Sequence, residues 1–137
     1  MMANILHQEN HGAALAAPQV GLNKRIVVID YMNEYRELIN PQILESEGSQ
    51  LDDEGCLSLP GLWGKVWRAK TVTITYKDRN GHEFIITREN EMARCLQHEI
   101  DHLNGILFID HLQEGDLEDS SGRKIHVKKI QELSRNS

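Results

Sequence analysis

The hydrophobic positions of this chain fall mainly into short runs rich in β-branched and aromatic residues, which are typical of β-strands. Two such runs, KRIVVID at 24–30 and YRELIN at 35–40, flank a polar turn. Two more, VTITYKD at 72–78 and HEFIITR at 82–88, flank an Asn-Gly dipeptide at 80–81. This dipeptide predicts a β-hairpin with a type I′ turn, in which both central residues have positive φ.

One stretch, ENEMARCLQHEIDHLNG at 89–105, instead places its hydrophobic residues at helical spacing. They recur at i, i+4, i+8 and i+11 and predict one stripe that faces a core. The stripe consists of Met92, Leu96, Ile100 and Leu103. Asn90 is the expected N-cap, and Glu91 in the first turn suits the helix dipole. Gly105 is a natural stop at the C′ position.

The remaining segments complete the order of elements. Residues 1–11 carry apolar residues at helical spacing and predict a short helix. GAALAAPQVG at 12–21 is rich in small residues and ends in proline and glycine, which predicts a packed loop. The acidic stretch 114–121 is expected to be exposed, and KIHVKKIQEL at 124–133 predicts a last surface helix. The order helix, strands, hairpin, helix, helix indicates the α+β class.

Length and composition fit one globular domain. The 137 residues suffice for a single core, and 39% hydrophobic with 26% charged residues argues against disorder. The longest strongly apolar runs, such as IVVI at 26–29, are far too short to cross a bilayer. The first eleven residues lack a basic region followed by an apolar core, so no secretion signal is expected. The net charge of −6 argues against nucleic acid as the main partner.

The chain has two cysteines, Cys56 and Cys95. One disulfide is arithmetically possible. Without a secretion signal, however, a reducing compartment and a metal-binding or catalytic role are the better interpretation.

The motif His-Glu-x-x-His lies within QHEIDH at 97–102. On a helix, His98 and His102 are about 6 Å apart along the axis and share a face, so both imidazoles can reach one metal ion. Glu99 is turned by about 100° and can sit beside a metal-bound water as a general base. For the pentapeptide alone, a chance match on an amphipathic helix is the alternative.

A third ligand decides the class of site, and the downstream candidates have no distinctive context. The protease signature that continues to a third histidine requires it at a position that holds Phe108. A glutamate on a second helix is a further alternative. The candidates of this kind are Glu114, Glu118 and Glu132.

The two cysteines are the upstream candidates. Cys95 shares roughly the helix face of the histidines but lies about 4.5 Å further toward the N-terminus, where side chains lean away from the ion. It is therefore expected to be a small buried residue in the wall of the site. Cys56, in EGCLSLP at 54–60, can approach the helix from outside and complete a Cys-His-His set that leaves a fourth position for water. An ordinary buried thiol is the alternative for Cys56.

Three segments in this order, GAALAAPQ at 12–19, EGCLSLP at 54–60 and QHEIDH at 97–102, resemble the three signature motifs of the peptide deformylase family. The resemblance covers nearly the whole chain, including LNGILFID at 103–110. It implies an α+β fold with small mixed or antiparallel sheets packed around a central metal-binding helix. It also implies a metal-dependent hydrolase that removes the formyl group from the N-terminal formyl-methionine of new bacterial or organellar proteins.

The resemblance assigns roles to single residues. The metal ligands that it matches are Cys56, His98 and His102. The implied ion is Fe²⁺, one per chain, with Ni²⁺, Co²⁺ or Zn²⁺ as substitutes. Glu99 matches the general acid/base. The side-chain amide of Gln19 and the backbone N–H of Leu57 match the groups that stabilise negative charge on the formyl oxygen.

The same resemblance implies where the substrate lies. The residues that it places beside the substrate are Ala14, Gly55, Arg68, Arg94 and Cys95. For Arg68, a solvated surface charge is the alternative. The small residues at 12–18 would let the backbone approach a peptide, which could pair like an added strand. The expected partners are formyl-methionyl ends of nascent chains and the ribosome exit region, in the bacterial cytoplasm or an organellar matrix. Neither nucleic acid nor a membrane is an expected partner.

The chain departs from the family pattern at two places. The second glycine of Gly-x-Gly-Leu-Ala is Ala14, whose methyl group is costly only at positive φ or at very close backbone approach. The chain also begins at Met1, partway along the first family helix, so one domain over 1–137 without the usual N-terminal segment is expected. Two alternatives to an active deformylase follow: a relative that binds metal or peptide without turnover, and a zinc endopeptidase, which fits the Cys56 motif poorly.

Overall fold

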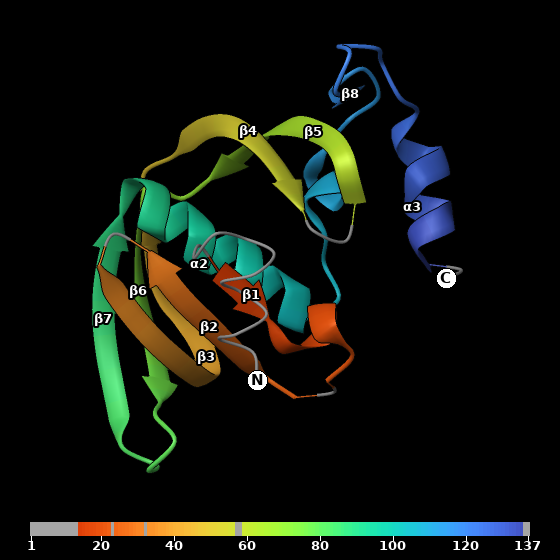
Figure 1. The fold of residues 1–137 in the computed structure, drawn as a ribbon. Coiled ribbons are helices and arrows are strands. Elements are labelled where there is room, and N and C mark those ends of the chain that lie inside the picture. Colours follow the sequence, from red (N-terminus) through yellow and green to blue (C-terminus); the bar gives the residue numbers. More distant parts are fainter. Residues whose placement is uncertain (1–13, 23, 32, 57–58, 136–137) are drawn as a thin grey trace.

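The computed structural model describes residues 14–22, 24–31, 33–56 and 59–135 (Figure 1). The short helix predicted over 1–11 lies outside these residues. Two antiparallel sheets flank the helix α2 (Asn90–Leu103), which runs through the middle of the described fold (Figure 1). The α+β class with small sheets around a central helix is therefore confirmed.

The larger sheet has the strand order β1-β2-β3-β6-β7, and each neighbouring pair is antiparallel. Its strands are β1 (Ala14–Ala16), β2 (Ile26–Tyr31), β3 (Glu34–Glu47), β6 (Thr71–Lys77) and β7 (Glu83–Glu89). Four of them coincide with the four predicted runs. Their inward side chains, such as Val27, Leu38 and Ile74, are 0% exposed and form the first core against α2.

Strand β3 continues well beyond the predicted run, which ends at residue 40. The continuation passes Pro41, and the pairing with β6 shifts register between Ile39 and Gln42. A proline cannot donate to a strand ladder, so an irregularity at this place is physically required.

The packed loop predicted over 12–21 is partly wrong. Ala14–Ala16 pair with β2 as strand β1, and Ala17–Val20 form the 3-10 helix η1. The expected packing is nevertheless present, because Ala14 is 3% exposed and Ala17 is 0% exposed. Alanine has little strand preference of its own, so the pairing with β2 decides the conformation.

The β6–β7 hairpin is confirmed, but its turn is not of type I′. Gly81 has a φ of 82°, whereas Asn80 is not among the described residues with positive φ. The carboxylate of Asp78 instead accepts hydrogen bonds from the backbone N–H groups of Asn80 and His82, at 2.9 and 3.0 Å. The Asp78 carboxylate thus satisfies two backbone N–H groups of the loop, and Gly81 supplies the left-handed conformation that the turn needs.

The smaller sheet, of order β4-β5-β8, lies on the other side of α2 (Figure 1). Its strands are β4 (Gln50–Cys56), β5 (Leu59–Arg68) and β8 (Leu117–Asp119). None of the three is predicted from the sequence. The acidic stretch 114–121 was expected to be exposed, and this expectation is partly wrong. Strand β8 lies within the stretch, and its Leu117 is 0% exposed.

A second hydrophobic core packs against the smaller sheet. Its buried members are Val66, Phe108, Ile109, Leu112, Leu117 and Val127. Leu112 directly follows the 3-10 helix η2 (Phe108–His111), and the other members come from β5, β8, η2 and the helix α3 (Val127–Arg135). The presence of α3 confirms the last predicted helix. Glu114 accepts a hydrogen bond from the backbone N–H of Val127 at 2.7 Å and so caps the start of α3.

Helix α2 packs its predicted stripe on the larger sheet. Met92, Leu96 and Ile100 are buried there, and Leu103 lies at the margin of the same core. Gln97 ties the helix to the segment between β5 and β6, because its amide accepts from the N–H of Ala69 and donates to the C=O of Ala69, both at 2.9 Å.

The two ends of α2 differ from each other. Asn90 is not the N-cap as predicted; Glu89 holds that position without a side-chain hydrogen bond, and Asn90 has a left-handed φ of 58°. The C-terminal stop is confirmed. Gly105 has a φ of 73°, and the N–H groups of Gly105 and Ile106 bond to the carbonyls of His102 and Asp101. This pair of bonds is a Schellman motif.

No helix among the described residues is long and apolar enough to span a membrane.

Candidate metal and active site

His98 and His102 face each other from consecutive turns of α2. Their Nε2 atoms are 3.1 Å apart, and their ring centroids are 4.9 Å apart. Two nitrogen ligands at about 2.1 Å from one tetrahedral ion would be roughly 3.4 Å from each other. The pair therefore fits a single metal ion, as its i, i+4 spacing predicts.

Glu99 lies beside this pair. One ligand atom from each of His98, Glu99 and His102 can be chosen so that all lie within 4.8 Å of one another. Glu99 is 5% exposed and His102 is 6% exposed. A buried carboxylate at this distance can accept a proton from a water molecule held near the histidines.

Glu54, near the end of β4, orients His98. Its Oε1 atom lies 2.8 Å from Nδ1 of His98. Because a carboxylate only accepts, Nδ1 carries the proton, and in the neutral ring the lone pair lies on Nε2, which faces His102. A carboxylate behind a histidine ligand is a common arrangement in metal sites, where it fixes the ring and raises its basicity.

Two buried arginines hold Glu54 in turn. Nε and Nη2 of Arg68 each donate to one carboxylate oxygen at 2.9 Å, and Nη1 of Arg94 donates to Oε2. Burial raises the pKa of Glu54, but the hydrogen bonds from Arg68 and His98 outweigh it and hold this pKa well below its usual range. The carboxylate behind His98 is therefore charged at neutral pH.

The ionic network continues along α2. Nη1 of Arg68 donates to Oδ2 of Asp101 at 2.6 Å, and the same oxygen lies 2.9 Å from Nε2 of His111. Burial raises the pKa of Asp101, but the hydrogen bonds with His111 and Arg68 leave it lower than usual. Arg68, on β5, thus binds one carboxylate on β4 and one on α2, and the carboxylate on β4, Glu54, orients a candidate metal ligand.

A cavity of about 370 Å³ opens beside these residues, within the size range of small-ligand sites. His98 and Glu99 form part of its wall. Strands β1, β2, β4 and β5 supply the opposite walls through Ala14, Tyr31, Gly55 and Trp63. The candidate catalytic groups therefore face a space that a substrate can enter.

Of the residues expected beside the substrate, the structure brings four to this cavity. They are Ala14, Gly55, Arg94 and Cys95. Arg68 does not line it, because its side chain is 4% exposed and is occupied by Glu54 and Asp101. Its position favours an indirect role through the network. Contact of these residues with a substrate stays a prediction.

Ala14 does not need the conformational freedom of glycine. It is absent from the described residues with positive φ, and it pairs regularly with Ile29 of β2. The methyl group therefore causes no backbone strain at this position.

The residues expected to supply a third metal ligand and to stabilise the oxyanion fall largely outside the described atoms. Cys56 ends β4, and its backbone pairs with Leu59. The side chains of Cys56 and Gln19 and the whole of Leu57 lie outside the described structure. Two residues before Cys56, Glu54 already contacts His98, so β4 leads directly to the histidines.

The downstream glutamates have other surroundings. Glu114 caps α3, and Glu118 forms an ion pair with Lys124 at 2.6 Å. Glu132 is exposed on α3, and Phe108 is buried in the second core. None of them belongs to the histidine group found among the described residues.

Cys95 lies where the sequence predicts it, in the cavity wall and against the first core. It is a free thiol. Burial raises the pKa of this thiol, and the charge of Glu99 raises it further. The protonated form is therefore favoured at neutral pH.

The sequence does not identify Glu54, Tyr31 or Trp63 as site residues. Glu54 could have been predicted from the sequence, because it is a charged residue in the same EGCLSLP segment as Cys56. Tyr31 and Trp63 have no comparable motif, and only the packing of β2 and β5 brings them to the cavity.

Comparisons with known proteins identify a family that this chain resembles in sequence and in fold. The family model for polypeptide deformylase matches residues 1–118. The chain is 54% identical over 109 residues to the peptide deformylase of Desulfitobacterium hafniense, covering 80% of this chain and 72% of that protein. It is also 54% identical over 105 residues to peptide deformylase 1 of Clostridium perfringens, covering 75% of this chain and 71% of that protein.

A solved structure also resembles this chain. The peptide deformylase of Legionella pneumophila matches with a TM-score of 0.78 and 39% identity, covering 99% of this chain and 80% of that chain. Agreement over this much of the chain, in sequence and in fold, shows that the protein belongs to the polypeptide deformylase family.

Proposed function

We propose that this protein is a metal-dependent deformylase that hydrolyses the formyl amide at the N-terminus of formyl-methionyl peptides. The products are formate and a peptide with a free amino terminus. The observation that carries the proposal is the pair of Nε2 atoms 3.1 Å apart beside the buried carboxylate of Glu99, at the wall of a ligand-sized cavity.

His98, His102 and the sulfur of Cys56 would hold the ion. A set of two imidazoles and one thiolate suits iron, nickel, cobalt and zinc alike, so Fe²⁺ as the native ion rests on the family resemblance. When bound, the ion supplies Lewis acidity, which lowers the pKa of a water molecule toward neutrality and polarises the formyl oxygen.

Glu99 moves the proton in this scheme. Its carboxylate takes a proton from the water that attacks the formyl carbon and returns it to the methionine nitrogen as the C–N bond breaks. The side-chain amide of Gln19 and the backbone N–H of Leu57 donate to the formyl oxygen, where negative charge develops. Glu54 keeps His98 in one orientation throughout.

The substrate would lie along β1. This strand stands at the end of the described sheet order, and Ala14 lines the cavity. An extended peptide can pair with such an edge through its backbone. Gly55, Arg94 and Cys95 would then enclose the methionine side chain, while Arg68 would act indirectly through Glu54.

The natural substrates would be nascent chains that still carry formyl-methionine. Their deformylation would take place near the ribosome exit region, in the bacterial cytoplasm or an organellar matrix. Residues 1–137 would act as one deformylase-like domain.

Formate release tests the proposal. The chain is purified without oxygen, loaded with ferrous, nickel or zinc ions, and given a formyl-Met tripeptide or its acetyl-Met counterpart. We expect formate from the formyl peptide and no cleavage of the acetyl peptide. Bound metal without turnover in all three forms would instead indicate a binding protein, and cleavage of internal peptide bonds would indicate an endopeptidase.

A further inference from the structure

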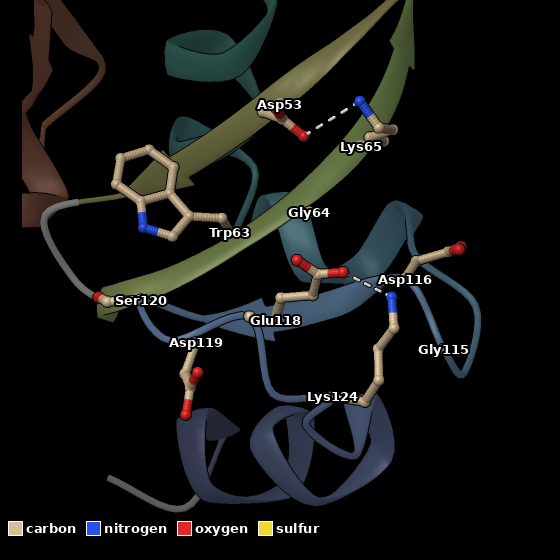
Figure 2. A pocket seen from close by; sticks show the side chains of 11 residues that line it. Asp53, Trp63, Gly64, Lys65, Gly115, Asp116, Glu118, Asp119, Ser120 and Lys124 are labelled. Carbon is tan, nitrogen blue, oxygen red and sulfur yellow. Dashed lines mark hydrogen bonds and ion pairs between the residues drawn. The ribbon is translucent and has the colours of Figure 1, made fainter.

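Trp63, on β5, stands between two hollows of the molecule. It lines the cavity of about 370 Å³ that His98 and Glu99 also line. It also lines a second hollow, of about 620 Å³, between β5 and the segment around β8 (Figure 2). Figure 2 shows its indole projecting from the ribbon of β5 toward the end of the neighbouring strand β4. Asp53, on β4, is the other described residue that lines both hollows.

Gly55 on β4 leaves room for the indole of Trp63, because glycine has no side-chain atoms. A Cβ atom on Gly55 would lie 2.7 Å from Cζ3 and 2.8 Å from Cε3 of Trp63. Only glycine therefore lets the ring rest against the β4 backbone at this point. Despite this contact, Trp63 remains 50% exposed. A flat apolar surface thus rests against the β4 backbone and is still open to a ligand.

The substrate of the proposed reaction is a polypeptide, so only its formylated end can occupy the smaller cavity. The formyl carbon must lie near His98 and Glu99, and the following residues must leave the cavity. Trp63 is the aromatic residue between this cavity and the neighbouring hollow. An exposed indole at that place can stack on a passing side chain.

We propose that Trp63 is a specificity-determining residue that contacts the side chains following formyl-methionine and favours aromatic over small ones. This inference rests on the proposed deformylase function. Aromatic pairs in proteins are worth a factor of about three to ten in affinity beyond the area that they bury. The expected preference is therefore moderate and lies in kcat/KM.

Two substrates of equal length test the proposal: formyl-Met-Phe-Phe amide and formyl-Met-Ala-Ala amide. In Trp63→Ala, the ratio of their kcat/KM values should fall about three- to tenfold, and Trp63→Phe should retain most of the original ratio. Trp67→Ala is the matched control. Trp67 lies on the same strand and is 65% exposed, but it lines neither hollow, so its loss should leave the ratio unchanged.

Fluorescence supplies a readout that needs no turnover. The chain has two tryptophans, so Trp67→Phe leaves Trp63 as the sole indole emitter. With Glu99→Gln added to prevent hydrolysis, formyl-Met-Phe-Phe amide should change the emission more than the Ala-Ala peptide does. An unchanged substrate ratio in Trp63→Ala, or equal emission changes with both peptides, would overturn the proposal. Absence of formate from both peptides in the wild-type chain would instead contradict the deformylase function.

Discussion

Replacing Glu99 with glutamine should lower kcat/KM for a formyl-Met peptide by about 10²- to 10⁴-fold, the usual contribution of a positioned general acid/base. The amide of glutamine preserves the size of the side chain but cannot accept the proton of the attacking water. The side chain is 5% exposed, so bulk water cannot readily take its place. Formate release and bound metal should be measured on the same samples.

The matched control for Glu99→Gln is Glu91→Gln. Glu91 also lies on α2 and at the cavity wall, but it is exposed and stands two helical turns before Glu99. We expect Glu91→Gln to stay within a few-fold of the wild type. If Glu99→Gln retained near-normal turnover with full metal content, another group would have to carry the proton, and the assignment would fail.

Glu54→Gln should have the largest effect on stability, and it should also weaken metal binding. Neutralising Glu54 leaves the guanidinium groups of Arg68 and Arg94 buried without their shared carboxylate. Breaking a buried ion pair by removing one partner costs about 3–5 kcal/mol in the free energy of unfolding. The carboxylate behind His98 is lost as well, which typically lowers metal affinity by about 10- to 100-fold.

Urea unfolding of the metal-free chain and metal titration measure these two effects separately. Glu37→Gln serves as the control, because Glu37 pairs with Arg79, whose side chain is 72% exposed. Loss of such a surface pair should cost no more than about 1 kcal/mol. Equal destabilisation by both substitutions would contradict the importance assigned to the buried network.

The parts of the fold that the sequence predicts are those in which burial follows a local period. Leu96 and Ile100 repeat at helical spacing and lie in the first core, so the sequence alone suffices to predict α2. Strands β4 and β8 cannot be predicted in this way. Their sequences are polar or acidic, and the inward residue of β4 is Glu54, whose partners Arg68 and Arg94 are distant in sequence.

The residues of the candidate site were likewise predictable only where a local sequence motif defines them. His98, Glu99 and His102 follow from one helical motif, and the structure brings them together. Glu54 and Trp63 become part of the site only through the pairing of β4 with β5. Arg68 is a residue for which the family resemblance and the structure point to different roles, since it lies in the ionic network and not at the cavity.

The most direct test of the account is a metal titration of activity. Ferrous or nickel ions are added to the metal-free chain, and formate release from a formyl-Met peptide is followed against the ratio of metal to protein. We predict that activity rises linearly and levels off at one ion per chain, in the wild type and in Cys95→Ser, and that Cys56→Ser fails to gain activity. Full activity without added metal, or full activity of Cys56→Ser at one ion per chain, would contradict the proposed site.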